Sequence, residues 1–217
     1  MAAGHEFFCI LQCAFFILQY AIFFINLCPL PDEQVGVFCP VPGTMAKKIY
    51  FITGGARSGK SAHAEQLARS FGGRRAYIAT AQALDAEMAA RIAKHRKDRG
   101  DAWDTYEEPL AVAELLGKLS LRYEVVLLDC LTLWLSNVMA HSDGDGAVLS
   151  RSDELVKAIR EFGGSLIVVS NEVGLGIVPD NPLARKFRDL AGMLNQKVAR
   201  TADEVYFTAA GIPVKIK

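Results

Sequence analysis

The sequence feature that most restricts the fold is a strand, loop and helix pattern in residues 49–66. A short apolar run ending at Thr53 is followed by G-x-x-x-x-G-K-S at residues 54–61 and then by helix-forming residues. In this pattern, glycines let successive backbone N–H groups point at phosphate oxygens, and the N-terminus of the next helix adds a favourable dipole. The segment therefore predicts a loop that binds a nucleotide polyphosphate, but it leaves the reaction open.

Two side chains of this phosphate loop, residues 54–61, are expected to have chemical roles. Lys60 would reach the outer phosphates, and Ser61 would hold Mg²⁺. The backbone expected to surround the phosphates belongs to Gly54, Gly55, Ala56, Arg57, Ser58 and Gly59. A glycine-rich turn with an incidental lysine is the structural alternative, which the strand before it and the helix after it disfavour.

Composition separates the first 44 residues from the rest of the 217-residue chain. No Lys or Arg precedes Lys47, whereas seven of the 12 Phe and four of the 5 Cys precede Met45. Met45-Ala-Lys-Lys, followed at once by the first strand, looks like a natural protein start. We therefore expect residues 1–44 to be a non-native or dispensable extension, and residues 45–217 to form one nucleotide-binding domain.

A membrane anchor is the alternative interpretation of this extension. Residues 7–27 are almost continuously apolar and long enough to span a bilayer. However, they lack flanking cations that would set an orientation, and they lack the positively charged region of a signal peptide. We expect a cytoplasmic location, with membrane association only if the extension is genuine. The single cysteine after Met45, Cys130, fits a reducing compartment.

The charge balance after Met45 argues against a nucleic-acid surface. All 24 basic residues but only 21 of the 24 acidic residues lie there, because three acidic residues precede it, so the net charge is +3. Such a small excess suits a nucleotide-binding enzyme rather than a nucleic-acid-binding protein.

Strand-like runs alternate with helical stretches along residues 45–217. Strands are predicted at residues 49–53, 75–79, 125–129, 166–170 and 205–208, and several of them are continuously apolar. Helices are predicted at residues 60–70, 85–99, 109–119, 131–140, 152–161 and 182–200, with a polar loop at 141–150. This alternation predicts an α/β domain with a mostly parallel sheet covered by helices on both faces, and a ligand at the carboxyl ends of its strands.

A carboxylate ends one of these strands. Residues 125–129 read Val-Val-Leu-Leu-Asp, which is the form of the second nucleotide-binding strand in phosphate-loop proteins. Asp129 could therefore orient Mg²⁺ or touch the nucleotide. A turn residue or helix cap is the alternative, but the presence of the phosphate loop favours a functional role.

The predicted helix at residues 85–99 carries a histidine beside several cations. Met88 and Ile92 are expected to face the core, and His95 lies on a second face. The cations that follow it are Arg96, Lys97 and Arg99. Cationic neighbours disfavour protonation of an imidazole, which leaves a ring nitrogen free to act as a nucleophile, and they attract a triphosphate. From spacing alone, a solvated basic helix end is the favoured interpretation.

Two further features are weaker. The sequence Asn-Glu-Val-Gly-Leu-Gly-Ile-Val-Pro at residues 171–179 follows a predicted strand, so Glu172 could act on a hydroxyl or a metal, and the glycines could let the loop approach a ligand. A structural turn is the alternative. His63 is expected to lie on the face of the first helix without a catalytic role.

Taken together, several segments resemble the bifunctional adenosylcobinamide kinase and adenosylcobinamide-phosphate guanylyltransferase family of cobalamin biosynthesis. The segments are TGGARSGKS at 53–61, YIATAQALDAEMAARI at 77–92, the histidine and its basic followers at 95–99, LLDCLTLWLSN at 127–137, SNEVGLGIVPDNPLARKFRDLAGMLNQ at 170–196, and the GIPVKIK ending. The NEVGxGIVP string is far more specific than the phosphate loop. Residues 1–44 have no counterpart in the family.

The resemblance implies two successive reactions. The first is phosphorylation of the aminopropanol hydroxyl of adenosylcobinamide with ATP or GTP. The second is transfer of GMP from GTP to that phosphate through a guanylylated histidine, which gives adenosylcobinamide-GDP. His95 matches the position of that histidine, and Lys94 precedes it where some members carry a second histidine. The alternative is a phosphate-loop kinase of another small molecule, which predicts no protein-bound GMP.

The resemblance also implies the composition of the site. Lys60 and His95 would be catalytic, and Ser61 would bind Mg²⁺. The nucleotide would contact the phosphate loop together with Ala79, Thr80, Ala81, Arg96, Lys97, Asp98, Arg99, Glu107 and Asp129. The family's sheet resembles the recombinase-type phosphate-loop fold, and its members can assemble as trimers, so we expect a homo-oligomer.

Overall fold

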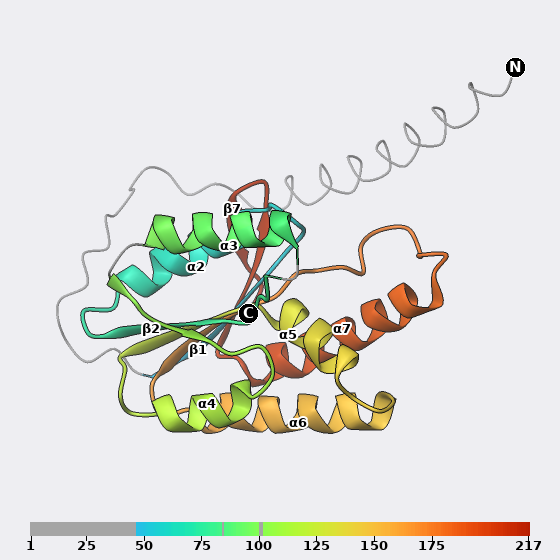
Figure 1. Ribbon diagram of the computed structural model, residues 1–217. Helices are drawn as coiled ribbons and strands as arrows, with labels where there is room; N and C mark the ends of the chain where they lie inside the picture. The colour runs from blue at the N-terminus through green and yellow to red at the C-terminus, as the bar shows by residue number, and fades with distance from the viewer. Residues whose placement is uncertain (1–46, 84, 100–101) are drawn as a thin grey trace, which may run out of the picture. The chain divides into compact units, whose positions relative to one another are not determined.

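The computed structural model describes residues 47–83, 85–99 and 102–217 (Figure 1). The predicted extension at residues 1–44, with its apolar stretch, lies outside these ranges. Within them, no helix combines the length and the apolar character needed to cross a membrane.

A seven-stranded sheet, with order β3-β2-β4-β5-β1-β6-β7, forms the centre of the described domain. The strands are β1 (Ile49–Thr53), β2 (Arg75–Ala79), β3 (Asp104–Glu107), β4 (Val125–Asp129), β5 (Ser165–Val169), β6 (Glu204–Ala209) and β7 (Ile212–Lys215). All neighbouring strands pair in parallel except β6 and β7, which are antiparallel. The prediction of an α/β domain with a mostly parallel sheet is therefore confirmed.

Helices cover both faces of this sheet (Figure 1). They are α2 (Lys60–Arg69), α3 (Ala86–Arg99), α4 (Val112–Leu119), α5 (Leu131–Ala140), α6 (Asp145–Glu161) and α7 (Pro182–Thr201). On one face, Ala64 and Ala68 of α2 pack against strand residues such as Ile52 and Leu127. The two-sided cover explains why the central strands are continuously apolar rather than alternating.

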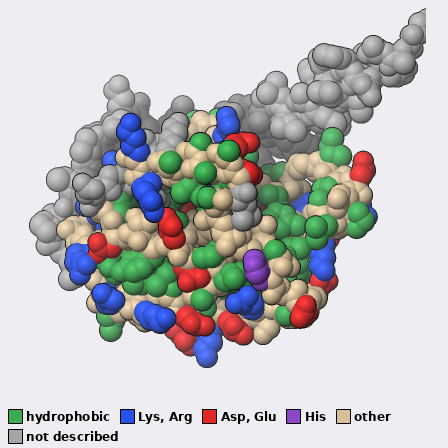
Figure 2. Space-filling model, viewed as in Figure 1, with side chains coloured by type: hydrophobic (Ala, Val, Ile, Leu, Met, Phe, Trp, Pro, Cys, Tyr) green, Lys and Arg blue, Asp and Glu red, His purple; other side chains and the backbone are tan. Residues whose placement is uncertain are grey.

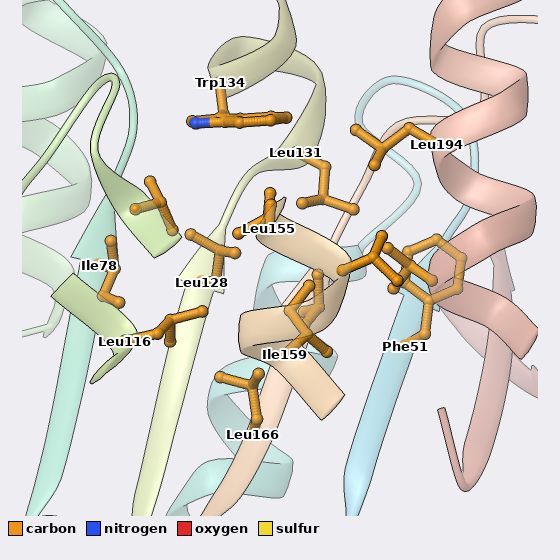
Figure 3. Close-up of a cluster of buried hydrophobic side chains, with 14 of the residues drawn as sticks. Phe51, Ile78, Leu116, Leu128, Leu131, Trp134, Leu155, Ile159, Leu166 and Leu194 are labelled. Carbon is orange, nitrogen blue, oxygen red and sulfur yellow. The ribbon is translucent and has the colours of Figure 1, made fainter. Parts of the chain in front are cut away.

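The larger core lies on the opposite face of the sheet, under α4, α5, α6 and α7 (Figure 3). Phe51, Ile78, Leu128 and Leu166 come from four adjacent strands, whereas Leu116, Trp134, Leu155 and Leu194 come from the four helices. All of these side chains are at most 2% exposed. This packing fixes the strand ends from which the candidate site is built.

The two edge strands, β3 and β7, were not predicted from the sequence. β3 reads Asp-Thr-Tyr-Glu and is largely exposed, and every residue of β7 is exposed. An edge strand needs no apolar run because it is not buried on both faces, and Pro213 in β7 argues against a strand in any sequence-based reading.

The polar loop predicted at residues 141–150 is wrong over its second half. The helix α6 begins at Asp145 instead of residue 152, and Val148 in its first turns is buried. The glycines Gly144 and Gly146 resemble loop residues, but an acidic residue in the first turn and a buried valine favour the helix. The start of α4 also differs, since the Glu108 carboxylate accepts from the N–H groups of Leu110 and Ala111 before the helix begins.

Candidate active site

The phosphate loop leaves the end of β1 and leads directly into α2. Gly54 has φ +148° and Gly59 has φ +95°, which are conformations that residues with side chains rarely adopt. A Cβ atom at Gly54 would lie 2.3 Å from the carbonyl oxygen of Thr208, and one at Gly59 would lie 3.0 Å from Cα of Gly211. Both glycines are therefore required by the close approach of the hairpin, through Thr208 of β6 and through Gly211 in the turn between β6 and β7.

A hydrogen bond joins the same turn to the phosphate loop. The Gly211 N–H donates to the carbonyl oxygen of Ser58 at 2.9 Å, although 153 positions separate the two residues in the numbering. The C-terminal hairpin of β6 and β7 therefore shapes the loop. Sequence reasoning missed this contact because a glycine in a turn carries no signal of what it packs against.

The Lys60 side chain lies within the loop and is only 6% exposed. Its ammonium group donates to the carbonyl oxygen of Gly55 and to Oγ of Ser58, the latter at 3.4 Å. The positive charge is therefore held among the backbone groups that the sequence predicts to surround phosphates. This geometry can balance the charge of phosphate oxygens without a large movement of the side chain.

Ser61 and Asp129 are brought together from α2 and β4. The Asp129 Oδ2 atom accepts a hydrogen bond from Oγ of Ser61 at 3.1 Å and another from the Tyr77 hydroxyl at 2.8 Å. A hydroxyl oxygen and a carboxylate oxygen are the hard ligands that Mg²⁺ prefers. Across the described ranges, no group of three or more His, Cys, Asp or Glu side chains could hold a metal by itself. The pair fits an ion that keeps most of its coordination for phosphate and water.

The predicted residues after β2 lie beside Asp129. Ala79 is paired with Asp129 in the sheet register, and the Thr80 N–H donates to the Asp129 carbonyl oxygen at 3.1 Å. Thr80 is fully buried, and its hydroxyl donates to the Cys130 carbonyl oxygen at 2.8 Å and accepts from the Cys130 N–H at 2.9 Å. Its side chain therefore fixes the ends of β2 and β4, whereas Ala79 and Ala81 are partly exposed.

The helix α3 is linked to this edge of the sheet by an ion pair between Arg96 and Glu107, the last residue of β3. His95 is half-buried, and Arg96 and Lys97 are exposed. None of the described side chains of α3 is buried; Met88 and Ile92, which were expected to face the core, are only half-buried. The side chains of Asp98 and Arg99 lie outside the described residues. The described side chains of α3 are therefore not part of the core, and the ion pair links the helix to the carboxyl end of β3.

The loop after β5 lies next to the phosphate loop. The Glu172 N–H donates to the Gly54 carbonyl oxygen at 2.9 Å, and the Glu172 carboxylate accepts from the Gly174 N–H at 2.7 Å. The carboxylate thus stabilises its own turn. A role for Glu172 on a hydroxyl or a metal stays a prediction.

His63 has the position expected of a helix-face residue. Its ring packs edge-on against Tyr206 of β6, with the ring centroids 5.1 Å apart. Burial lowers the pKa of this imidazole, and its Nε2 atom is buried without a hydrogen-bond partner. These contacts describe a side chain of α2 that is packed against β6.

Comparison with known proteins gives matches over the same domain. The family model described as cobinamide kinase / cobinamide phosphate guanyltransferase matches residues 50–216. The chain is 47% identical over 166 residues to the bifunctional adenosylcobalamin biosynthesis protein CobP of Pseudomonas aeruginosa, covering 76% of this chain and 95% of that protein. It is 43% identical over 178 residues to the bifunctional adenosylcobalamin biosynthesis protein CobU of Escherichia coli, covering 76% and 98%. A solved structure, the RadB recombinase, is similar with a TM-score of 0.42 and 16% identity, covering 74% of this chain and 73% of that one.

Proposed function

Because the chain belongs to the cobinamide kinase / cobinamide phosphate guanyltransferase family, we propose that it phosphorylates adenosylcobinamide and then transfers GMP to the product. The observation that supports this most is the phosphate loop, with Lys60 inside it and Ser61 bonded to Asp129 at the carboxyl end of β4. The family match favours two reactions over a kinase of another small molecule.

In the kinase reaction, the aminopropanol hydroxyl oxygen attacks the γ-phosphorus of ATP or GTP. The bond from that phosphorus to the bridging oxygen breaks, the nucleoside diphosphate leaves and the hydroxyl proton passes to solvent. The Lys60 ammonium, held by the loop, stabilises negative charge on the outer phosphates. Ser61 and Asp129 would hold Mg²⁺, which neutralises charge on the phosphate oxygens when bound.

In the guanylyltransferase reaction, a ring nitrogen of His95 attacks the α-phosphorus of GTP, and pyrophosphate leaves. A phosphate oxygen of adenosylcobinamide phosphate then attacks the same phosphorus, and the histidine is released. The half-buried position of His95 on α3, beside the exposed Arg96 and Lys97, supports this role. The cations would screen the α-phosphate during attack.

The remaining predicted residues complete the proposed nucleotide site. Backbone groups of residues 54–59 would surround the phosphates. The residues that would line the rest of the site are Ala79, Thr80, Ala81, Arg96, Lys97, Asp98, Arg99 and Glu107. The support for this assignment is the direction of the strands. Because β1, β2, β3 and β4 run parallel, their carboxyl ends lie on the same side of the sheet, where a ligand is expected.

We also propose that the protein assembles as a homo-oligomer, specifically a trimer. We further propose that it lies in a reducing compartment. The support for assembly is the edge strand β7, on which Ile212, Val214 and the following Ile216 are 65%, 51% and 62% exposed. The support for the compartment is that Cys130, the single cysteine after Met45, has a free and buried thiol.

The test is turnover by the full chain. Incubation with adenosylcobinamide, ATP, GTP and Mg²⁺ should yield adenosylcobinamide phosphate and then adenosylcobinamide-GDP, both resolved by mass spectrometry. Recovery of unaltered adenosylcobinamide from an intact, folded preparation would rule the proposal out.

A further inference from the structure

The loop between β5 and α7 carries a concentrated group of exposed apolar side chains. Leu175, Ile177 and Val178 are 77%, 97% and 57% exposed, and Leu183 in the first turn of α7 is 65% exposed. We call these four residues the loop patch. They are four of the nine large hydrophobic side chains that are exposed in the described residues, and they fall within nine positions, so they are not the usual scattered surface residues.

Figure 1 shows this loop projecting from the domain between β5 and α7, and Figure 2 shows hydrophobic side chains on the projecting part. Its start is held by backbone hydrogen bonds to the strand and loop beside it. The Ser170 N–H donates to the Ile52 carbonyl oxygen at 3.0 Å, and the Glu172 N–H donates to the Gly54 carbonyl oxygen at 2.9 Å. Within the loop, the Glu172 carboxylate accepts from the Gly174 N–H.

Hydrogen bonds also hold the other end of the loop, at the start of α7. One guanidinium nitrogen of Arg185 donates to the carbonyl oxygens of Pro179 at 2.9 Å and Asp180 at 2.7 Å. The Asn181 side chain caps α7 by accepting from the N–H of Leu183 at 2.8 Å. Because both ends are hydrogen-bonded, the outward direction of the apolar side chains is a property of the folded loop.

The hydrogen bond from the Glu172 N–H to the Gly54 carbonyl oxygen places the start of this loop beside the phosphate loop, three residues before Leu175. The proposed acceptor substrate is a corrinoid, a macrocycle with many methyl groups that is larger than the nucleotide and reacts through one hydroxyl. The phosphate loop can hold only the nucleotide phosphates. An apolar surface on the loop that starts beside it can pack against the methyl groups of the macrocycle.

We propose that Leu175, Ile177, Val178 and Leu183 form the docking surface for the corrinoid ring of adenosylcobinamide, so that its hydroxyl is directed toward the transferred phosphate. The inference rests on the proposed function and adds the acceptor side of the site to it. The exposed side chains of β7, rather than the loop patch, are the surface that we assign to subunit contact.

The experiment uses a double variant that carries both Leu175→Asn and Ile177→Asn. It is compared with the wild type and with the matched control Leu121→Asn. Leu121 is also 77% exposed and lies in the turn after α4. Because all three side chains are exposed, the variants should fold. We expect the KM for adenosylcobinamide to rise at least about tenfold in the double variant, since burial of one aliphatic side chain contributes about that factor.

The same variants should keep the KM for ATP, and equilibrium dialysis with coloured adenosylcobinamide should show the same loss of affinity without turnover. The control should behave as the wild type in each assay. An unchanged KM and unchanged dialysis in the double variant would overturn the docking surface. So would a lower mass in light scattering, which would make the loop patch a subunit contact. If the wild type itself does not phosphorylate adenosylcobinamide, the proposed function fails, which is a separate result.

Discussion

At the scale of single residues, the position of Lys60 defines the phosphate-binding end of the site. The side chain is buried, and its ammonium donates to acceptors within the loop that precedes it. Ser61, the next residue, bonds to the carboxylate of Asp129 across the sheet edge. Because Ser61 lies on α2 and Asp129 ends β4, this hydrogen bond joins the phosphate loop and its helix to the end of the strand.

Substitution Lys60→Ala should reduce kinase activity about 100-fold or more, because one positioned charge on a transferring phosphate contributes about that much. The measurement is the initial rate of adenosylcobinamide phosphorylation at saturating ATP. The exposed Lys157→Ala serves as the matched control and should keep full activity. Wild-type rates in Lys60→Ala would mean that the loop is not the donor site.

His95 separates the second reaction from the first. In His95→Ala, GTP labelled at its α-phosphate should no longer give acid-labile GMP bound to the protein, because the attacking nitrogen is gone. Phosphorylation of adenosylcobinamide should stay within a few-fold of the wild type. The control is His141→Ala, at the exposed C-cap of α5. Undiminished labelling of His95→Ala would exclude this histidine as the nucleophile.

At the scale of secondary-structure elements, the C-terminal hairpin of β6 and β7 supports the phosphate loop. Gly211 in its turn bonds to Ser58 and leaves 3.0 Å for a Cβ atom at Gly59. The hairpin is thus the last element of the described chain and yet a direct neighbour of the first loop. The loop geometry depends on both.

The variant Gly59→Ala should lose about 1–3 kcal/mol of unfolding free energy, since it combines a positive φ with a contact against the Gly211 backbone. The KM for ATP should rise about tenfold, because a shift of the loop misplaces the phosphate-binding groups. Urea unfolding and steady-state kinetics measure the two effects. In the control Gly72→Ala, a Cβ atom meets nothing within 4 Å, so stability should change little. Equal stability of the two variants would show that the hairpin does not constrain the loop.

The sequence predicts those elements that have a strong local pattern. The central strands are identified by continuous apolar runs, and the phosphate loop and Asp129 by their spacing. β3 and β7 are missed because short exposed edge strands need no such run. The role of Thr80 is missed as well, because no local pattern predicts its hydrogen bonds to Cys130, 50 positions away. The contact between the hairpin and the phosphate loop joins distant parts of the chain, and no local sequence pattern indicates it.

At the scale of the whole domain, the candidate site and a cluster of charged side chains lie at opposite ends of the parallel strands. The carboxyl ends of β1, β2, β3 and β4 carry the candidate site, whereas the opposite edge carries a charge cluster around Glu204 at the start of β6. The Glu204 carboxylate is 14% exposed and accepts from Lys48 at 2.8 Å, from the Tyr206 hydroxyl at 2.7 Å and from Lys215 at 3.1 Å. The cluster thus ties β7 and the start of β1 to β6.

This cluster should make stability depend on acid. The hydrogen bond from Lys48 is the largest cause that lowers the pKa of Glu204 from 4.5 to about 2, so the contribution of Glu204 to stability is full above the unfolded-state pKa. It is lost as the pH falls through the window from about 4.5 to about 2.

The measurement is the difference in unfolding free energy between the wild type and Glu204→Gln, by urea titration at several pH values. We expect a difference of about 2 kcal/mol near neutral pH, which shrinks as the pH falls below about 4.5. The exposed Glu161→Gln should show no such trend. A difference that does not vary with pH would contradict the assignment.

The central claim is that one chain breaks nucleotides at two different phosphates. The most direct measurement uses two samples of GTP, labelled at the γ- or at the α-phosphate, with adenosylcobinamide and the full chain. The account predicts that the γ-label enters adenosylcobinamide phosphate and that the α-label passes through the protein into adenosylcobinamide-GDP. Transfer of the γ-label alone, with the α-label remaining in free nucleotide, would contradict it.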